Sequence, residues 1–295
     1  MKAVINCDDF SFNFGFSQGI LKSYQKGIAT STSIRVNTAA YPKSKQLLKK
    51  ELKNIGKGIH VDLTHGPFLT QQIMKSSGKY GLSYLEYLLK FTLPSRKLIE
   101  LVRNEVETQV AKAENDGVKI DHINGHDHVH MIPSIFRIFC EVAQKHDIKW
   151  IRMVNEPLYF VDDIKLNAKI FFYGNYLKHI LLNIFSWVNK PIADKFGLKT
   201  TDAFYGLMYS NNMNAEVIIK SLENALKRGF KTIEIASHPA QPLSPFDMGV
   251  KQDKFTAWFS NLDERRVEMQ ALMDPAVINF IKKNKIKLVS YNKLL

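Results

Sequence analysis

Cysteine is scarce in this sequence, since Cys7 and Cys140 are the only two among 295 residues. Two cysteines cannot form the disulfide framework on which small secreted domains depend. The N-terminal residues Met1–Asp9 reach two carboxylates before an apolar signal-peptide region could form. Both features predict a cytoplasmic protein in a reducing compartment.

Acidic residues are also few: 28 aspartates and glutamates stand against 41 lysines and arginines, which leaves a formal net charge of +13. Such an excess suits an anionic partner, namely nucleic acid, a phospholipid surface or a phosphorylated substrate. It is equally typical of a solvated, lysine-rich surface. No helix-turn-helix, zinc-finger or RNP-like pattern occurs, so we expect no nucleic-acid partner.

Long uninterrupted apolar runs are absent as well. The apolar stretch Lys169–Val188 carries Lys178, His179 and two asparagines, which argues against a membrane-spanning helix. Its polar residues recur at helical spacing and leave a wide apolar face: Asn175, His179, Asn183 and Ser186. One interpretation is that this face packs against the protein core or against a second subunit of a homodimer. The other is a peripheral contact with the inner face of a membrane or with a lipid-linked substrate, assisted by the basic charge.

Short β-branched runs alternate with amphipathic helical stretches, which is typical of a parallel α/β sheet. The predicted strands are Lys2–Cys7, Thr30–Asn37, Gly56–Leu63, Lys119–Asn124, Lys149–Val154, Ala203–Leu207, Thr232–Ser237 and Lys287–Tyr291. The predicted helices are Gln18–Lys26, Lys43–Lys53, Tyr84–Asn115, Ser134–Lys145, Lys165–Asn189, Ala215–Arg228 and Leu262–Lys283, with breaks at Pro94 and Pro275. No linker and no internal repeat divides the chain. This pattern predicts a single α/β domain over residues 1–295 with a TIM-like barrel fold.

Polar side chains gather where the predicted strands end. They are Asp8 and Asp9 after the first strand, His60 near the end of the third, His126, Asp127, His128 and His130 after the fourth, Arg152 on the fifth and His238 after the seventh. The carboxyl ends of all parallel strands in a barrel share one rim, so these side chains should converge. The segment Thr64–Gly81 follows the same rim, and we interpret it either as a substrate loop or as a plain surface loop.

Most of these signals are weak individually. Adjacent strand residues point to opposite sides, so Asp8 and Asp9 need different tasks unless the strand bends. A lone histidine in an apolar strand, such as His60, is more often a core residue than a ligand. The strong signal is His122–His130, which holds four histidines and an aspartate. Histidine mixed with carboxylate suits Zn²⁺, Mn²⁺ or Fe²⁺, whereas Mg²⁺ prefers oxygen ligands.

These groups predict amide hydrolysis assisted by a divalent metal ion, held by one carboxylate and two imidazoles with positions left for water and a carbonyl oxygen. A neighbouring carboxylate would take the proton of the water, and a histidine would protonate the departing amine. No Gly-x-Ser-x-Gly elbow and no Cys–His signature supports a covalent mechanism instead.

The sequence resembles the YdjC-like carbohydrate deacetylases, the family that includes chitooligosaccharide deacetylases and the hopanoid-biosynthesis deacetylase. The resemblance covers nearly the whole chain and rests on Asn6–Phe10, Thr30–Asn37, Gly58–Thr64, Asp121–His130 with Pro133, and His238–Pro239. Ile151–Pro157 and Asp202–Leu207 look closest to the hopanoid-type branch. Three positions, Ser11, Asn124 and Ala240, depart from residues frequent in the family, but none of them is a predicted ligand.

The resemblance implies a distorted TIM-like barrel that removes the N-acetyl group from an acetylamino sugar, with one metal ion that is usually taken as Mg²⁺. Carried over by position, the implied metal ligands are Asp9, His60 and His126. The implied base is Asp8 and the candidate acid is His238. The candidate substrate contacts are Arg152, which could instead orient another group, and His128, His130 and Asn37.

Two alternatives remain open. His126 and His130 also match the metal pair of NodB-type polysaccharide deacetylases, an assignment that would leave His60 without a role. The other alternative is a non-catalytic barrel that binds a sugar or a lipid. The complete set of candidate catalytic residues argues against it, because an inactive site usually loses a ligand.

Overall fold

The structure is a computed structural model that describes residues 1–70, 82–172, 174–248 and 263–294. Residues 71–81 of the predicted loop and Leu262 of the last predicted helix lie outside the described residues.

The eight predicted strands are all present. They are β1 (Lys2–Phe10), β2 (Ser31–Ile34), β3 (Gly56–Val61), β4 (His122–Gly125), β5 (Trp150–Ile151), β6 (Ala203–Tyr205), β7 (Thr232–Ser237) and β8 (Lys287–Leu288). The sheet has the order β5-β4-β3-β2-β1-β7-β6, with β8 paired to the start of β1, and the pairings are parallel. Most strands are shorter than predicted, because fewer of their residues take part in the ladders.

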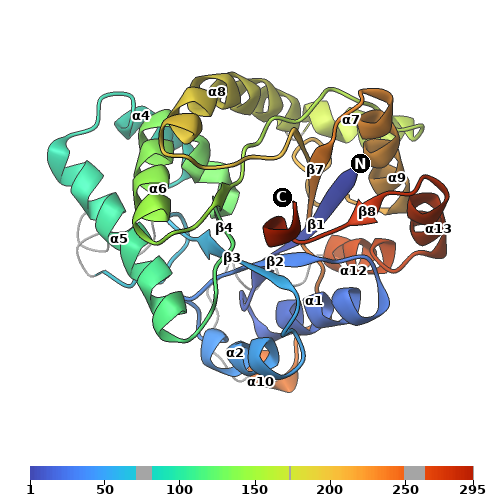
Figure 1. Cartoon of the computed structure of the whole chain (residues 1–295), viewed down its shortest axis with the longest axis horizontal. Coiled ribbons are helices and arrows are strands. Elements are labelled where there is room, and N and C mark those ends of the chain that lie inside the picture. The colour runs from blue at the N-terminus through green and yellow to red at the C-terminus, as the bar shows by residue number, and fades with distance from the viewer. Residues whose placement is uncertain (71–81, 173, 249–262, 295) are drawn as a thin grey trace.

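The sheet curls into an incomplete barrel surrounded by helices (Figure 1). Its edge strands β5 and β6 form no ladder with each other in the described part of the chain. An isolated parallel bridge joins Trp150 of β5 to Lys199, shortly before β6. The prediction of a distorted TIM-like barrel is therefore confirmed, and the distortion is the gap between these two edges.

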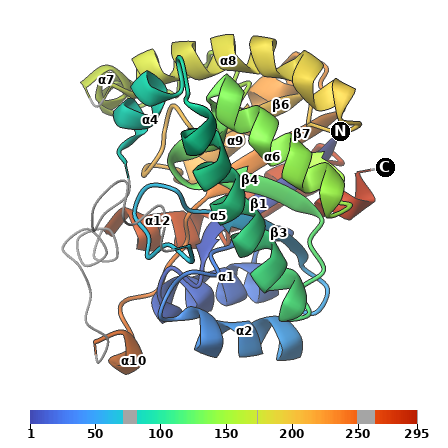
Figure 2. The ribbon, with the colours of Figure 1, turned by 90° about the vertical axis from the view of Figure 1, so that its left-hand side faces the viewer.

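The helices form a ring around the strands (Figures 1 and 2). They are α1 (Phe14–Lys26), α2 (Tyr41–Lys50), α4 (Tyr84–Lys90), α5 (Arg96–Asn115), α6 (Pro133–Lys145), α7 (Ile164–Phe172), α8 (Asn175–Lys195), α9 (Ala215–Lys227), α10 (Pro245–Met248), α12 (Asp263–Ala271) and α13 (Pro275–Lys283), with short 3₁₀ turns η1 (His126–Met131) and η2 (Tyr291–Lys293). Pro94 lies in the break between α4 and α5, and Pro275 begins α13, where Asp274 caps the helix by accepting the amide N–H of Ala276. Among the described helices, none is long and apolar enough to cross a membrane.

The C-terminal residues fill the barrel at the amino ends of its strands. Tyr291 is buried and stacks on His122 of β4, with 4.1 Å between the ring centroids. Val4, Trp150 and Leu294 complete this cluster around Tyr291. One end of the barrel is thus closed by side chains, which leaves the carboxyl ends of the strands for a site.

Helix α8 packs against the protein through a face that carries His179, Ser186 and Asn189 together with the buried Leu182 and Ala193. His179 Nε2 lies 2.7 Å from the carbonyl oxygen of Glu156. Ser186 donates to the carbonyl of Val154, and Asn189 donates to the carbonyl of Met131. The opposite face is exposed and carries Leu177, Ile180, Ile184 and Trp187. Most of the large apolar side chains of α8 thus point outward, whereas Leu182 and Ala193 join the core.

Candidate active site

The end of β1 bends, and this bend brings both aspartates to one side. Asp9 has a positive φ of 65°, which is uncommon for a residue other than glycine. The register between β1 and β2 shifts between Cys7 and Phe10, as at a β-bulge. Asp8 and Asp9 both approach His60 as a result, with closest N–O distances of 3.9 and 3.6 Å. The strict alternation of an ideal strand would have separated them.

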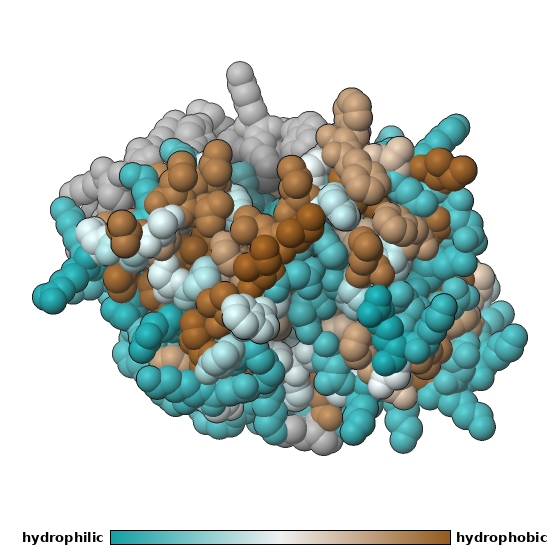
Figure 3. Space-filling view, turned by 90° about the horizontal axis from the view of Figure 1, so that it is seen from above, coloured by the Kyte–Doolittle hydropathy of each residue, from teal (hydrophilic) through white to brown (hydrophobic). Residues whose placement is uncertain are grey.

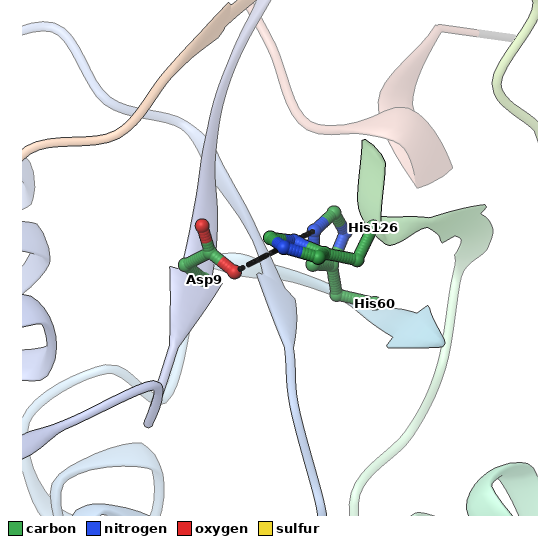
Figure 4. A group of neighbouring side chains, drawn as sticks. All are labelled: Asp9, His60 and His126. Carbon is green, nitrogen blue, oxygen red and sulfur yellow. Dashed lines mark hydrogen bonds and ion pairs between the residues drawn. The ribbon is translucent and has the colours of Figure 1, made fainter. Parts of the chain in front are cut away.

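Asp9, His60 and His126 form a buried cluster at the carboxyl ends of β1, β3 and β4 (Figure 4). Asp9 Oδ1 lies 3.3 Å from His126 Nδ1 and 3.6 Å from His60 Nε2, and the two imidazole nitrogens are 3.3 Å apart. Neither carboxylate oxygen of Asp9 has a hydrogen-bond partner among the described residues, although the buried Arg35 guanidinium lies 3.6 Å from Oδ1. A buried carboxylate without such a partner, faced by two imidazoles, fits a divalent metal ion.

The orientation of His60 is set by Asn124 on the neighbouring strand. The Asn124 side-chain oxygen lies 2.6 Å from His60 Nδ1, so this nitrogen carries the hydrogen and Nε2 keeps a lone pair toward Asp9. The Asn124 amide donates in turn to Ser33 Oγ at 2.7 Å. Partners of this kind fix the tautomer and the ring plane of metal-binding histidines. Asparagine therefore supplies what an aspartate at this position would supply.

The two imidazoles differ in charge. Burial lowers the pKa of His60 to about 4 despite the carboxylates of Asp8 and Asp9, so this ring is neutral at neutral pH. Burial also opposes the charge on His126, but Asp127 and Asp9 outweigh it and raise the pKa of His126 to about 9. A metal ion that binds at His126 therefore displaces a proton.

Asp8 is held by a network of donors. Arg152 donates to both of its oxygens, at 2.6 and 2.9 Å, and Asn6 donates to Oδ1 at 2.8 Å. Burial alone would raise the pKa of Asp8, yet the Arg152 guanidinium and His60 bring it well below its usual range. Arg152 also donates to Glu234 and its side chain is fully buried, so it orients Asp8 and has no surface for a substrate.

His238 lies on the opposite side of Asp8, after β7. Its Nε2 is 3.9 Å from Asp8 Oδ2, and its Nδ1 is 3.6 Å from Glu268 Oε2 on α12. Glu268 also accepts the backbone N–H of His238 and the hydroxyl of Ser237. This carboxylate anchors the backbone at the end of β7, from which the imidazole projects.

These groups open into a cavity of about 360 Å³. It is lined by Asp8, His60, His65, Gly125, His126, Asp127, His128, Asn175, Lys178, Leu207, Ser210, Asn211 and His238. His128 is in a suitable place for a substrate contact, since its buried Nδ1 has no hydrogen-bond partner among the described residues. Five candidates predicted from the sequence thus meet around one cavity, and Asp9 lies directly beside it; the five are Asp8, His60, His126, His128 and His238.

Two other predicted substrate contacts lie elsewhere. His130 is fully buried, with Nδ1 accepting the N–H of Gly125 and Nε2 beside the carbonyl oxygen of Arg152 at 3.2 Å. Asn37 donates to the carbonyl of Pro67 and holds a loop. Both side chains therefore serve the local backbone, and neither lines the cavity.

Sequence reasoning missed part of the cavity wall. His65 Nε2 lies 3.1 Å from Asp127 Oδ2, and these two residues with His126 form a second group that could hold an ion. Lys178 and Asn175 belong to the first turns of α8 and line the cavity, although the sequence marks them only as polar positions of an apolar segment. His65 lies at the start of the loop that follows β3, so its position after a strand end was the available signal.

A larger groove of about 570 Å³ lies between α4 and α5. Its walls are mainly leucines, with two lysines as the charged groups. None of the described residues that line it carries a carboxylate or an imidazole, so hydrolytic chemistry belongs to the smaller cavity.

Comparison with known proteins identifies the family. A profile described as YdjC-like protein matches residues 2–283, and the chain therefore belongs to the YdjC-like family. The resemblance seen in the sequence is thus confirmed.

Named relatives extend over most of the chain. It is 27% identical to a carbohydrate deacetylase of Thermoanaerobacter pseudethanolicus over 291 residues, which cover 99% of this chain and 98% of the relative. It is 28% identical over 239 residues to a chitooligosaccharide deacetylase of Proteus mirabilis, with 80% of each chain covered. A crystal structure from Enterococcus faecalis V583, described as a proposed cellobiose-phosphate cleavage protein, superposes with a TM-score of 0.71 over 99% of this chain and 98% of that chain, at 18% identity. The last similarity shows the fold alone.

Proposed function

We propose that this protein is a metal-dependent hydrolase that removes the N-acetyl group from an acetylamino sugar. The observation that carries the proposal is the buried Asp9 carboxylate, which faces His60 and His126 and has Asp8 and His238 beside it in one cavity. The relatives named carbohydrate deacetylase and chitooligosaccharide deacetylase support the same chemistry.

Asp9, His60 and His126 would hold the metal ion. When bound, a divalent ion lowers the pKa of water and polarises the amide carbonyl. Two imidazoles with a carboxylate suit Zn²⁺, Mn²⁺ or Fe²⁺, whereas the family resemblance favours Mg²⁺. Elemental analysis of the purified protein identifies the ion.

Asp8 acts as the general base in this proposal. Its Oδ1 is occupied by Asn6 and Arg152, but Oδ2 accepts one hydrogen bond, from Arg152, and keeps an acceptor position. Arg152 keeps this carboxylate ionised and fixes its plane, so Oδ2 is ready to accept the proton of the attacking water.

His238 acts as the general acid that protonates the departing amine. Its Nε2 points toward Asp8 and the cavity, while Glu268 lies behind its Nδ1. This arrangement parallels other hydrolases in which a carboxylate orients a catalytic imidazole.

The direct test is the release of acetate from a panel of N-acetylated oligosaccharides and lipid-linked glycans by the metal-loaded protein. Asp8→Asn and His238→Gln should each lower kcat by about 10²- to 10⁴-fold while the metal content stays unchanged. No acetate from any substrate of the panel would favour the alternative of a non-catalytic barrel that binds a sugar or a lipid.

The ligand assignment is tested separately from catalysis. His60→Ala should lose bound metal, whereas His130→Ala should keep it, because both ring nitrogens of His130 face backbone groups. Loss of metal in His130→Ala alone would instead support the NodB-type pair of His126 and His130.

A further inference from the structure

The orientation of α8 is the reverse of that expected for a helix on the surface of a protein in water. Besides the small apolar contribution of Leu182 and Ala193, its inward face carries His179, Ser186 and Asn189, which bond to backbone carbonyls. Its outward face carries Leu177 and Trp187, with 71% and 81% of their surface exposed. Surface helices normally turn their apolar stripe inward. The reversal implies that the outward face meets an apolar medium or partner.

This outward face extends beyond α8. Phe172 at the end of α7 is 90% exposed, and Leu89 of α4 is 67% exposed. Figure 3 shows apolar side chains gathered across this side of the molecule. We define the apolar face as Leu89, Phe172, Leu177, Ile180, Ile184 and Trp187. A contiguous exposed apolar surface of this kind marks an interaction site.

The charges around the apolar face indicate which partner it suits. Residues 164–188 include no aspartate or glutamate and contain the exposed Lys165 and Lys169, whereas Lys178 lines the cavity and the exposed Asp162 and Asp163 precede this segment. In a symmetric homodimer the same surface meets itself, so these cations would face like charges. An anionic lipid surface offers the opposite charge together with an apolar interior, and interfacial helices with aromatic, aliphatic and lysine side chains bind such surfaces.

We propose that the apolar face docks onto an anionic lipid bilayer. The same helix reaches the catalytic cavity, because Asn175 and Lys178 line it. The Lys178 ammonium also lies 5.2 Å from the ring of Tyr84, which joins α4 to this rim. Docking therefore places the cavity beside the lipid surface and suits a membrane-associated or lipid-linked substrate. That substrate class rests on the proposed function, whereas membrane docking does not.

The test is co-sedimentation of the full-length protein with phosphatidylcholine vesicles, prepared with and without phosphatidylglycerol. We expect binding that requires the anionic lipid and weakens as salt is raised. The double variant Ile184→Ser with Trp187→Ser should bind at least about tenfold more weakly, since two apolar side chains no longer enter the interface. Val267→Ser, which alters an exposed apolar residue of α12, is the control and should bind like the parent protein.

Trp187 provides a second readout that does not depend on the double variant. Its emission should shift to shorter wavelength when anionic vesicles are added, and Trp187→Phe should lose this shift while it still sediments. The proposal is overturned if the parent protein does not bind anionic vesicles, or if the double variant binds as well as the parent. It is also overturned if light scattering shows a homodimer that the double variant disrupts while vesicles do not bind. Asp9→Asn should bind vesicles normally, so a failure of the deacetylase proposal is distinguishable from a failure of this one.

Discussion

Replacement of Arg152 by methionine gives a sharp test of how the site is built. The guanidinium makes four hydrogen bonds of 2.6 to 2.9 Å, two to Asp8 and two to Glu234. The three side chains are at most 2% exposed. Methionine fills a similar space but leaves two buried carboxylates without their cation. Removing one partner of a buried ion pair costs about 3–5 kcal/mol, so we expect a loss of about 4 kcal/mol in the free energy of unfolding.

The sign of the pH dependence follows from the pKa of Asp8. Arg152 holds this pKa below its usual range against the effect of burial. A carboxyl with a lowered folded-state pKa contributes stability above its unfolded pKa and loses it as the pH falls through the folded value. The stability difference between the parent and Arg152→Met should therefore be largest at neutral pH and shrink in acid. The acid limb of kcat/KM should move to higher pH in the variant.

The assays are denaturant unfolding and steady-state kinetics on the same preparations. Arg152→Lys should fall between the parent and the methionine variant, because an ammonium keeps the charge but cannot reproduce the planar fork. Arg103→Met is the control, since the ion pair of Arg103 with Glu141 is half-exposed and should contribute less than about 1 kcal/mol. A raised KM with unchanged kcat and unchanged stability would refute the positioning role and restore Arg152 as a substrate contact.

Three further predictions concern other parts of the molecule. Burial raises the pKa of Glu156 to about 7, so its contribution to stability is present below its unfolded pKa and is lost as the pH rises through about 7. The difference in unfolding free energy between the parent and Glu156→Gln should therefore fall over this range. A difference that does not depend on pH would contradict the assignment. Gly58→Ala would place a methyl carbon 2.2 Å from His122 Nε2, so it should destabilise the protein by about 1–3 kcal/mol. Denaturant unfolding measures this loss, and an unchanged unfolding midpoint would show that the His122 imidazole moves aside freely. Removal of the metal ion by a chelator should lower Tm, and added divalent ion should restore it. A free-ion concentration one hundred times Kd should stabilise the folded protein by about 3 kcal/mol. A Tm that calorimetry finds unchanged by both treatments would argue against a bound ion.

The sequence could predict where the candidate site lies because polar residues at the ends of apolar strands have few structural explanations. His60 and His238 were found in this way, and both line the cavity. Glu234 carries the same signal, a charge within the apolar strand Thr232–Ser237, and it could have been found too. The hydrogen-bond network of Arg152 could not be predicted, because Arg152 and Glu234 are 82 residues apart and the sequence does not specify their pairing.

Which face of helix α8 turns toward the protein could not be predicted from the sequence either. The spacing of Asn175, His179, Asn183 and Ser186 predicted a helix with two distinct faces, and α8 has them. Which face turns inward depends on whether backbone carbonyls need donors at that place. Here the irregular segment after β5 leaves the carbonyls of Val154 and Glu156 to be satisfied, and the polar face of α8 satisfies them. Local propensity contains no such information.

The two adjacent aspartates show why residue type alone does not assign a role. Asp8 accepts hydrogen bonds from Arg152 and Asn6, so its charge is already balanced by donors fixed in the protein. Asp9 accepts no hydrogen bond among the described residues, but it faces two imidazoles and the buried Arg35 guanidinium, which lies 3.6 Å from Oδ1. The lone pairs of Asp9 can ligate a metal ion, whereas a carboxylate with donors on one side can exchange a proton on the other. The bend in β1 lets both act on one cavity, and their different partners support metal binding by Asp9 and proton transfer by Asp8.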